Sequence, residues 1–388
     1  MTNGTSVNTI SEDGVFSGDA YTSAGDDENA LRVDGAVVTL EDITLEKTGG
    51  ASSNTEDGDF YGQNAGLLVL NGATATIKNA TVSTNAVNGN GVFCYGTGTT
   101  VNISDSTIRT TERNSGGIQT TGGGTMNATN LDIETQGASA AAIRSDRGGG
   151  TVTVTGGTYK TSGTGSPAVY CTADILVSGA TLTATASEAV VVEGKNSVSL
   201  QNCTITGSML GTYGEASGEH IHNIMIYQSM SGDAEVGHAT FSANGGTIAS
   251  QKGDMFYVTN TTCTISLSGV KLTLANDVLL SVEGNNASRG WGTVGANGGH
   301  VVFTADAQEM RGQIHVDEIS ALDLTMKNGT AFTGSINSNG QEGEVNVTLD
   351  ASSTWTLTAD SYITSFDGDA SKITANGYKL YVNGSAVN

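Results

Sequence analysis

The sequence predicts an all-β chain folded as a parallel β-helix, in which short strands wind into coils that stack along one axis. Three observations predict it. A pattern recurs about every 23–26 residues over much of residues 40–205. Each repeat contains stretches of alternating apolar and polar residues, which are typical of half-buried strands. The chain has only one proline, Pro167, and proline would remove a hydrogen bond from a sheet ladder.

The repeated segment has an aliphatic residue, two turn residues, a small or aliphatic residue, a polar residue and a second aliphatic residue. Residues Ile103 to Ile108 and Leu200 to Ile205 are examples. The second turn position is Asp42, Asn79, Asp105, Asn130, Gly156, Gly179, Asn202 or Gly269. Only Gly, Asn and Asp occur there, and these are the residues that tolerate a left-handed backbone. A tight left-handed corner is therefore expected in each coil.

Each coil is predicted to contain three short strands. In the coil that ends at Thr120, strand A covers residues 101–103, strand B 106–109 and strand C 117–120. Coils stack ~4.8 Å apart, and about fourteen of them account for the chain. We expect a cap at residues 1–30, the β-helix at 31–298, and further coils with a cap at 299–388. The expected interior residues are Ile77, Val82, Ile103, Ile108, Ile118, Ile133, Ile143, Val154, Val169, Leu182, Val190 and Ile205.

Four stretches carry a resemblance to known proteins: residues 115–120 (SGGIQT), 142–150 (AIRSDRGGG), 166–170 (SPAVY) and 187–196 (SEAVVVEGKN). They resemble the pectate-lyase-like superfamily of right-handed parallel β-helices, and most closely its adhesin-like surface or secreted members from Gram-positive gut bacteria. The resemblance covers residues 30–210, and residues 355–362 suggest a C-terminal cap of the same class. It implies a single right-handed β-helix and an extracellular or cell-wall-associated location.

The charge of the chain excludes some partners. With 39 acidic and 16 basic residues, the net charge is −23, whereas nucleic acids and anionic membranes bind basic surfaces. No stretch of about 18 apolar residues is present to span a membrane. No secretory signal precedes Thr2, so the expected location depends on the resemblance. We expect a monomer.

The outward side chains of strand C are the candidate binding surface. Charges are scarce in this chain, yet several gather beside this strand, together with aromatic rings, which suits the binding of sugars and carboxylates. Arg144 is expected between Gln119 and Tyr170. The predicted groove residues are Phe93, Gln119, Arg144, Asp146, Arg147, Tyr170, Glu188 and Glu193. The alternative is a network of surface ion pairs without a ligand.

Two functions remain open from the sequence. The favoured one is a non-catalytic, adhesin-like module that binds a glycan or another host or bacterial surface molecule through the strand C face. The rival is a polysaccharide lyase or glycoside hydrolase that acts on an acidic polysaccharide in the same groove. The Gly-His-Gly motif of the resembled polygalacturonases is absent, and the Asp-Asp pair Asp26-Asp27 lies ahead of the repeats, away from the strand C groove. The carboxylates Asp146, Glu188 and Glu193 are spread over three coils. No catalytic residue is therefore assigned.

Other candidate sites are weaker. Cys94, Cys171, Cys203 and Cys263 are expected to be buried and unbridged. His220 and His222 lack a third zinc ligand. No cofactor is expected, although calcium is an alternative at the acidic residues Asp26, Asp27, Glu28, Glu56, Asp57 and Asp59.

Two insertions, residues 47–64 and 284–299, interrupt the repeat and carry the large aromatic residues Phe60, Tyr61 and Trp291. Such loops either provide specificity or fold back over the coils.

Overall fold

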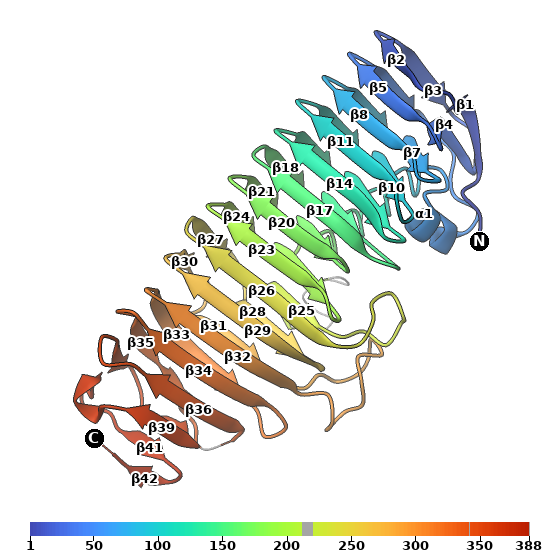
Figure 1. Cartoon of the computed structure of the whole chain (residues 1–388). Coiled ribbons are helices and arrows are strands. Elements are labelled where there is room, and N and C mark those ends of the chain that lie inside the picture. Colours follow the sequence, from blue (N-terminus) through green and yellow to red (C-terminus); the bar gives the residue numbers. More distant parts are fainter. Residues whose placement is uncertain (212–219, 341, 388) are drawn as a thin grey trace. The chain divides into compact units, whose positions relative to one another are not determined.

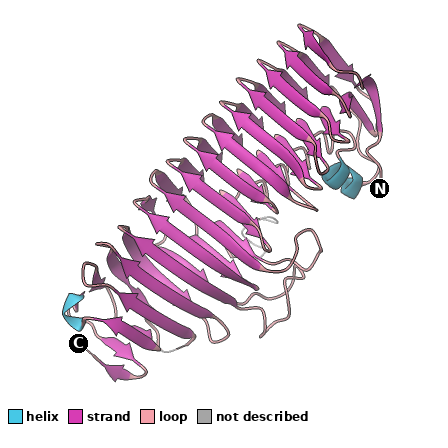
Figure 2. Cartoon of the chain, viewed as in Figure 1, coloured by secondary structure: helices cyan, strands magenta, loops and turns pink. Residues whose placement is uncertain are grey.

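In a computed structural model, the chain is built of stacked parallel strands with very little helix (Figure 2). The structure describes residues 1–211, 220–340 and 342–387. The predicted fold class, an all-β right-handed parallel β-helix, is confirmed. The chain divides into unit 1 (Met1–Val191 and Ile205–Glu219) and unit 2 (Val192–Thr204 and His220–Asn388), which are described separately.

In unit 1 each coil contains strands A, B and C, and each strand pairs in parallel with the same strand of the next coil (Figure 1). The A strands are β2 (Gly14–Ser17), β5 (Val37–Glu41), β8 (Thr74–Lys78), β11 (Thr100–Ser104), β14 (Gly124–Thr129), β17 (Gly150–Thr155) and β20 (Asp174–Ser178). The B strands are β3 (Ala20–Ser23), β6 (Thr44–Lys47), β9 (Thr81–Thr84), β12 (Thr107–Thr110), β15 (Asp132–Thr135), β18 (Thr158–Thr161) and β21 (Thr181–Ala184). The C strands are β1 (Thr5–Ile10), β4 (Glu28–Asp34), β7 (Leu67–Leu70), β10 (Val92–Tyr95), β13 (Ile118–Thr121), β16 (Ile143–Ser145) and β19 (Val169–Cys171).

Unit 2 continues the same pairing scheme within itself. Its A strands are β23 (Ser197–Gln201), β26 (His238–Asn244), β29 (Thr261–Ser268), β32 (Gly299–Asp306), β34 (Ala321–Lys327), β36 (Glu344–Leu349) and β39 (Ser365–Gly368). Its C strands are β25 (His222–Tyr227), β28 (Asp254–Thr259), β31 (Val278–Val282), β33 (Glu309–Val316), β35 (Ala331–Ile336), β37 (Thr354–Leu357) and β40 (Ile373–Thr374). The B strands β27 (Thr247–Ser250) and β30 (Lys271–Thr273) also belong to it, and β22 (Val190–Glu193) and β24 (Thr204–Gly207) fall on the unit boundaries.

Two features of unit 2 differ from the expected three-stranded coil. Among the described residues after β30, the coils consist of A and C strands alone; strands such as β32 and β33 are longer, and only two residues separate them. Near the C-terminus, β38 (Ser361–Ile363), β41 (Leu380–Val382) and β42 (Ser385–Ala386) form a small sheet beside a short 3₁₀ helix, η2 (Ala370–Lys372). Strand β42 pairs antiparallel with β41.

No helix in the described part of the chain is long and apolar enough to cross a membrane.

The left-handed corners are confirmed, and they show why Asp and Asn occur there. The corner residues have positive φ, for example +50° at Asp105 and +52° at Asn130. The Asn130 amide donates a hydrogen bond to the Asp105 carboxylate one coil away, at 2.9 Å. Asn79 does the same to Asp42, at 3.2 Å. A carboxylate in one coil is thus paired with an amide donor in the next.

The interior is mainly apolar, and all twelve residues predicted to lie inside are buried. Residues 1–30, expected to be a cap, form a complete coil from β1, β2 and β3. Its inward positions include polar side chains that bond to nearby backbone: Ser6 donates to the Asn8 carbonyl and Asn8 to the Ala30 carbonyl. All four cysteines are buried and none forms a disulfide.

Candidate functional site

The predicted strand C row of unit 1 exists in the expected register. Phe93 is aligned with Gln119, Gln119 with Arg144, and Arg144 with Tyr170. Arg144 therefore lies between Gln119 and Tyr170, as the repeat predicts.

This row is covered rather than open. The insertion at residues 47–64 contains helix α1 (Thr55–Tyr61), which is capped by the Asn54 side chain at its start and by left-handed Gly62 at its end. The Gln119 amide donates to the Asp59 carbonyl at 2.6 Å, and the Thr121 hydroxyl donates to the Phe60 carbonyl at 2.7 Å. The two alternatives for this insertion are thereby decided in favour of a cover, which the sequence analysis did not expect over these groove residues.

Three side chains of this covered row are buried. Phe93 and Gln119 are fully buried, and Arg144 is only 8 % exposed. Phe93 packs in a cluster with Ala65, Leu68 and Leu70. This part of the predicted groove is therefore closed by the chain's own helix.

Asp59 of α1 pairs with the Arg144 guanidinium, where the sequence predicts the carboxylate of a ligand. Arg144 lies 3.2 Å from the Asp59 carboxylate and 2.8 Å from that of Asp146. The amides of Asn88 and Asn114 donate to the two Asp59 oxygens at 2.9 and 3.1 Å. Burial works to lower the pKa of Arg144, but the charges of Asp59 and Asp146 outweigh it, so the pKa is raised and the guanidinium stays charged.

The other predicted residues are likewise engaged with neighbours. Arg147 stacks on the Phe60 ring, with 4.0 Å from the guanidinium carbon to the ring centre. Tyr170 is half-buried, and Glu188 is buried and accepts a hydrogen bond from Ser187 at 2.6 Å. Glu193 belongs to unit 2, where the Tyr227 hydroxyl donates to it at 2.9 Å. The alternative of a structural network thus describes most of these contacts.

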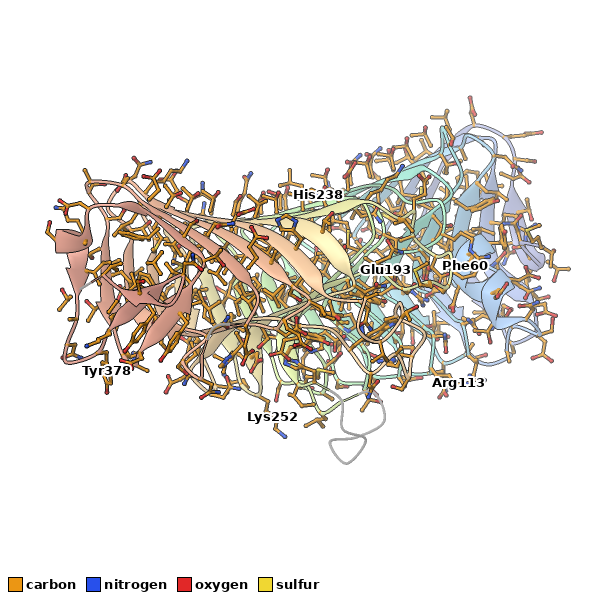
Figure 3. The ribbon with its side chains drawn as sticks, turned by 90° about the horizontal axis from the view of Figure 1, so that it is seen from below. Phe60, Arg113, Glu193, His238, Lys252 and Tyr378 are labelled. Carbon is orange, nitrogen blue, oxygen red and sulfur yellow. The ribbon has the colours of Figure 1, made fainter. Side chains whose placement is uncertain are left out.

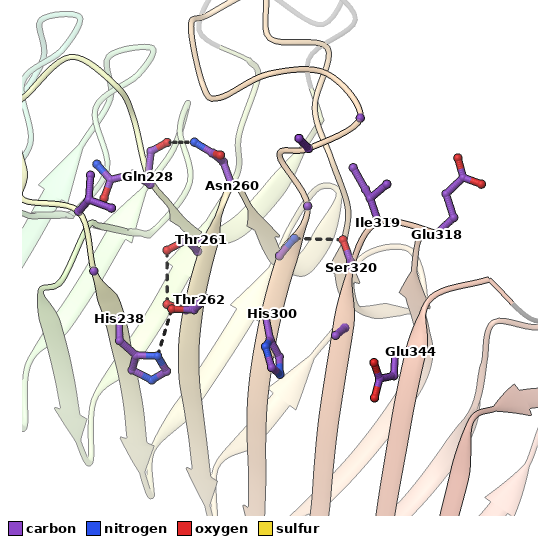
Figure 4. A pocket seen from close by; sticks show the side chains of 17 residues that line it. Gln228, His238, Asn260, Thr261, Thr262, His300, Glu318, Ile319, Ser320 and Glu344 are labelled. Atoms are coloured by element: carbon purple, nitrogen blue, oxygen red, sulfur yellow. Dashed lines mark hydrogen bonds between the residues drawn. The ribbon is translucent and has the colours of Figure 1, made fainter.

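Unit 2 contains an open groove that the sequence analysis missed. It has a volume of about 690 Å³ and lies over the beginnings of β26, β29, β32, β34 and β36 (Figure 4). Its walls are the connections from strand C to strand A, including residues 228–237 and the predicted insertion 284–299. That insertion contributes Gly295, Ala296 and Gly298 to the lining.

The floor of the groove is one row of side chains in register. His238 is aligned with Thr262, Thr262 with His300, His300 with Ala321, and Ala321 with Glu344. All except Ala321 are exposed, and His238 lies on the outside of its strand in Figure 3. Adjacent members are one strand spacing apart, ~4.8 Å.

A second row of side chains orients the first. His238 Nε2 lies 2.8 Å from the Thr264 hydroxyl, and His300 Nε2 lies 3.1 Å from the Asp323 carboxylate. The Asn346 amide donates to Asp323 at 3.0 Å. Burial works to raise the pKa of Asp323, but the hydrogen bonds from Asn346 and His300 outweigh it and lower the pKa. The ionised form of Asp323 is therefore favoured, and its carboxylate orients the His300 ring.

The sequence carried only a partial signal for this groove. The insertion at 284–299 is evident in the sequence, but the connection 228–237 and the turn at Asn260 border the same groove only in the folded chain. Between the long connections, β28 and β29 are joined by Asn260 alone, whose amide donates to the Gln228 carbonyl at 2.7 Å. A short turn beside longer ones leaves the floor accessible.

A second cluster in unit 2 lies on its C strands. The Asp254 carboxylate accepts hydrogen bonds from Ser281 at 2.6 Å and Asn276 at 2.7 Å, and lies 3.1 Å from His220 Nε2. The His220 ring stacks on Tyr257 with 3.9 Å between centres. His222, the other member of the His-Ile-His motif, is buried, and its Nδ1–H donates to the His220 carbonyl.

The carboxyl groups near His220 differ in their affinity for protons. Burial raises the pKa of Glu283, assisted by the charges of Asp254 and Asp317. Burial also works to raise the pKa of Asp254, but the hydrogen bonds from His220, Ser281 and Asn276 outweigh it and lower the pKa. Pairs of carboxyl groups whose pKa values are pushed apart are typical of acid–base sites.

The residues considered for calcium and zinc binding do not come together as a set of metal ligands in the described part of the chain. Asp26 and Asp27 accept hydrogen bonds from the backbone N–H groups of Ala51 and Ser53. Within the described ranges, no group of three or more His, Cys, Asp or Glu side chains is placed to hold a metal ion.

Comparison with known proteins gives no relative for this chain: no family model, no curated protein and no solved structure matches it.

Proposed function

We propose that the chain is a non-catalytic, adhesin-like module, secreted or displayed at the bacterial cell surface, that binds a glycan. The proposed location is supported by the resemblance of residues 30–210 and by a composition in which charged residues make up only 14 % of the chain. Fractionation of the native bacterium with an antibody against the chain tests the location. An exclusively cytosolic signal would contradict it.

The strand A face of unit 2, rather than the strand C face of unit 1, is the proposed binding surface. One observation carries this choice: imidazole, hydroxyl and carboxylate groups of His238, Thr262, His300 and Glu344 are exposed in one row along the groove. In contrast, α1 covers the strand C row of unit 1 at Gln119, which is fully buried and donates a hydrogen bond to the Asp59 carbonyl.

The spacing and chemistry of this row suit a sugar chain. A strand spacing of ~4.8 Å approximates the length of one ring in an extended glycan, so successive rings would meet successive strands. Each exposed polar group can exchange a hydrogen bond with water for one with a sugar hydroxyl, and Ile319 and Val236 offer apolar surface at the rim.

A glycan array with the full chain, followed by titration calorimetry of any binder, tests the proposal. His300→Ala removes one hydrogen-bonding group from the floor and should weaken binding by about 2- to 12-fold. Thr348→Ala is the matched control, because Thr348 is exposed on β36, beyond the groove residue Glu344 on the same face. Absence of any binder, or equal effects of both substitutions, would overturn the proposal.

A polysaccharide lyase or glycoside hydrolase is the second candidate. The observation that favours it is the cluster of His220, Asp254 and Glu283, in which burial raises the pKa of Glu283 while the hydrogen bonds to Asp254 lower its pKa. Incubation of array binders with the chain, followed by chromatography of the products, tests it. Shorter products that disappear with Glu283→Gln would establish catalysis, and intact glycan would exclude it for that ligand.

A further inference from the structure

The groove of unit 2 contains a gap in its floor. Ala321 is aligned between His300 and Glu344, and its side chain is a single methyl group. Two strand spacings separate the Cα atoms of His300 and Glu344, roughly 10 Å. Figure 4 shows the His300 ring and the Glu344 carboxylate on the strands either side of β34. The two longer side chains therefore flank a seat above Ala321.

The turn before β34 forms one side of this seat. Ile319 is 37 % exposed and presents an apolar surface, while Glu318 beside it is exposed. The Ser320 hydroxyl accepts a hydrogen bond from the Gly299 N–H at 3.0 Å and so joins this turn to the start of β32. A ring in the seat would contact Ile319 through its C–H groups and face carboxylates on two sides.

The charge of the groove selects among sugars. Glu318 and Glu344 are part of its lining, and none of the described lining residues is a lysine or an arginine. His300 already points Nε2 at Asp323. A uronate or sialate would meet the negative charge of Glu318 and Glu344 without a lysine or arginine partner, whereas an ammonium group would gain a charge-assisted hydrogen bond.

We infer that the seat above Ala321 binds a sugar unit with a free amino group, whose ammonium pairs with the Glu344 carboxylate. This inference rests on the proposed function of the same groove and narrows its ligand from glycans in general to amino-bearing ones. The acidic polysaccharide expected for the enzyme alternative would not fit this seat.

Matched oligosaccharides test the inference, because glucosamine and N-acetylglucosamine oligomers of equal length differ only in whether their amino groups are free or acetylated. The full chain should bind the glucosamine oligomer about tenfold more tightly at low salt. Glu344→Gln should remove this preference, and 0.5 M NaCl should reduce it by screening the charges. Ala321→Leu should abolish binding of both oligomers by filling the seat, while Thr348→Ala should change nothing.

The outcomes separate the two proposals. Equal binding of both oligomers, or a preference that survives Glu344→Gln, would overturn the amino-sugar inference and leave glycan binding in place. If Ala321→Leu left binding unchanged, the ligand would bind elsewhere than in this seat, and the amino-sugar inference would again be overturned. If no glycan on the array binds, the proposed function itself fails. Circular dichroism of each variant checks that the fold is retained.

Discussion

Replacing Arg144 by alanine should destabilise unit 1 strongly, although sequence analysis places this residue on an outer face. The side chains of Arg144, Asp59 and Asp146 are only 9, 11 and 4 % exposed. Arg144→Ala would leave two buried carboxylates without the cation between them. Asp59 would keep the hydrogen bonds from the Asn88 and Asn114 amides, and Asp146 the one from the Arg147 N–H, but none of these hydrogen bonds replaces the lost charge.

The expected loss of unfolding free energy is about 3–5 kcal/mol, the cost of breaking a buried ion pair by removing one partner. Arg109 provides the matched control, because it pairs with Asp132 where the two side chains are 38 and 57 % exposed. Arg109→Ala should therefore cost less than about 1 kcal/mol. The double variant Arg144→Ala with Asp59→Ala should cost less than the sum of the single changes, since the second substitution removes one unpaired charge.

Urea unfolding followed by far-UV circular dichroism measures these differences, and hydrogen exchange across residues 54–62 reports whether α1 loosens. A loss for Arg144→Ala as small as that for Arg109→Ala, with unchanged exchange in α1, would refute the description of Asp59 and Arg144 as a buried pair. It would also reopen the strand C face of unit 1 as a ligand groove.

Three further outcomes are expected. Asn130→Ala should cost about 1–2 kcal/mol in urea unfolding, because alanine is strained at φ +52°, whereas Asn130→Gly should cost less. The Cys94 thiol, whose pKa burial raises to about 12, should not react with a thiol reagent at pH 8 until urea is added; rapid native labelling would contradict its burial. Burial lowers the pKa of His222 from 6.5 to about 3, so the unfolded chain binds the proton first as pH falls. The free energy of unfolding should therefore fall by up to about 1.4 kcal/mol per pH unit below pH 6.5, and His222→Gln should reduce this dependence on pH.

The fold was predictable because its determinants are local and repeated. Every coil needs a left-handed corner, so residues such as Asp105 and Asn130 mark each turn from strand A to strand B. Once the corners are aligned, the register follows, and the positions of Gln119, Arg144 and Tyr170 along strand C were correct. Two-stranded coils after residue 299 were not anticipated. The left-handed corner persists there, with φ +48° at Ala307 and +56° at Asn328, so the corners alone do not show that the separate B strand is lost.

The state of the candidate site was not predictable from the repeat, because an insertion decides it. The register places Arg144 on an outer face, but only the folded chain shows that Asp59, far away in the sequence, lies against it. Part of the signal was available: Asn54, an acidic first turn and Gly62 are typical helix start and stop residues. They predict a short helix within 47–64 but not the surface on which it packs.

The contrast between the two units follows from the lengths of their connections. In unit 1 the insertion carries its own carboxylate, Asp59, to the basic side chain that the coils present, so the face is neutralised internally. In unit 2 the single-residue turn at Asn260 lies next to the longer connections 228–237 and 284–299, and the row from His238 to Glu344 stays exposed between them. In this β-helix, therefore, the repeat determines where side chains can line up, and the insertions determine which rows remain accessible to a ligand.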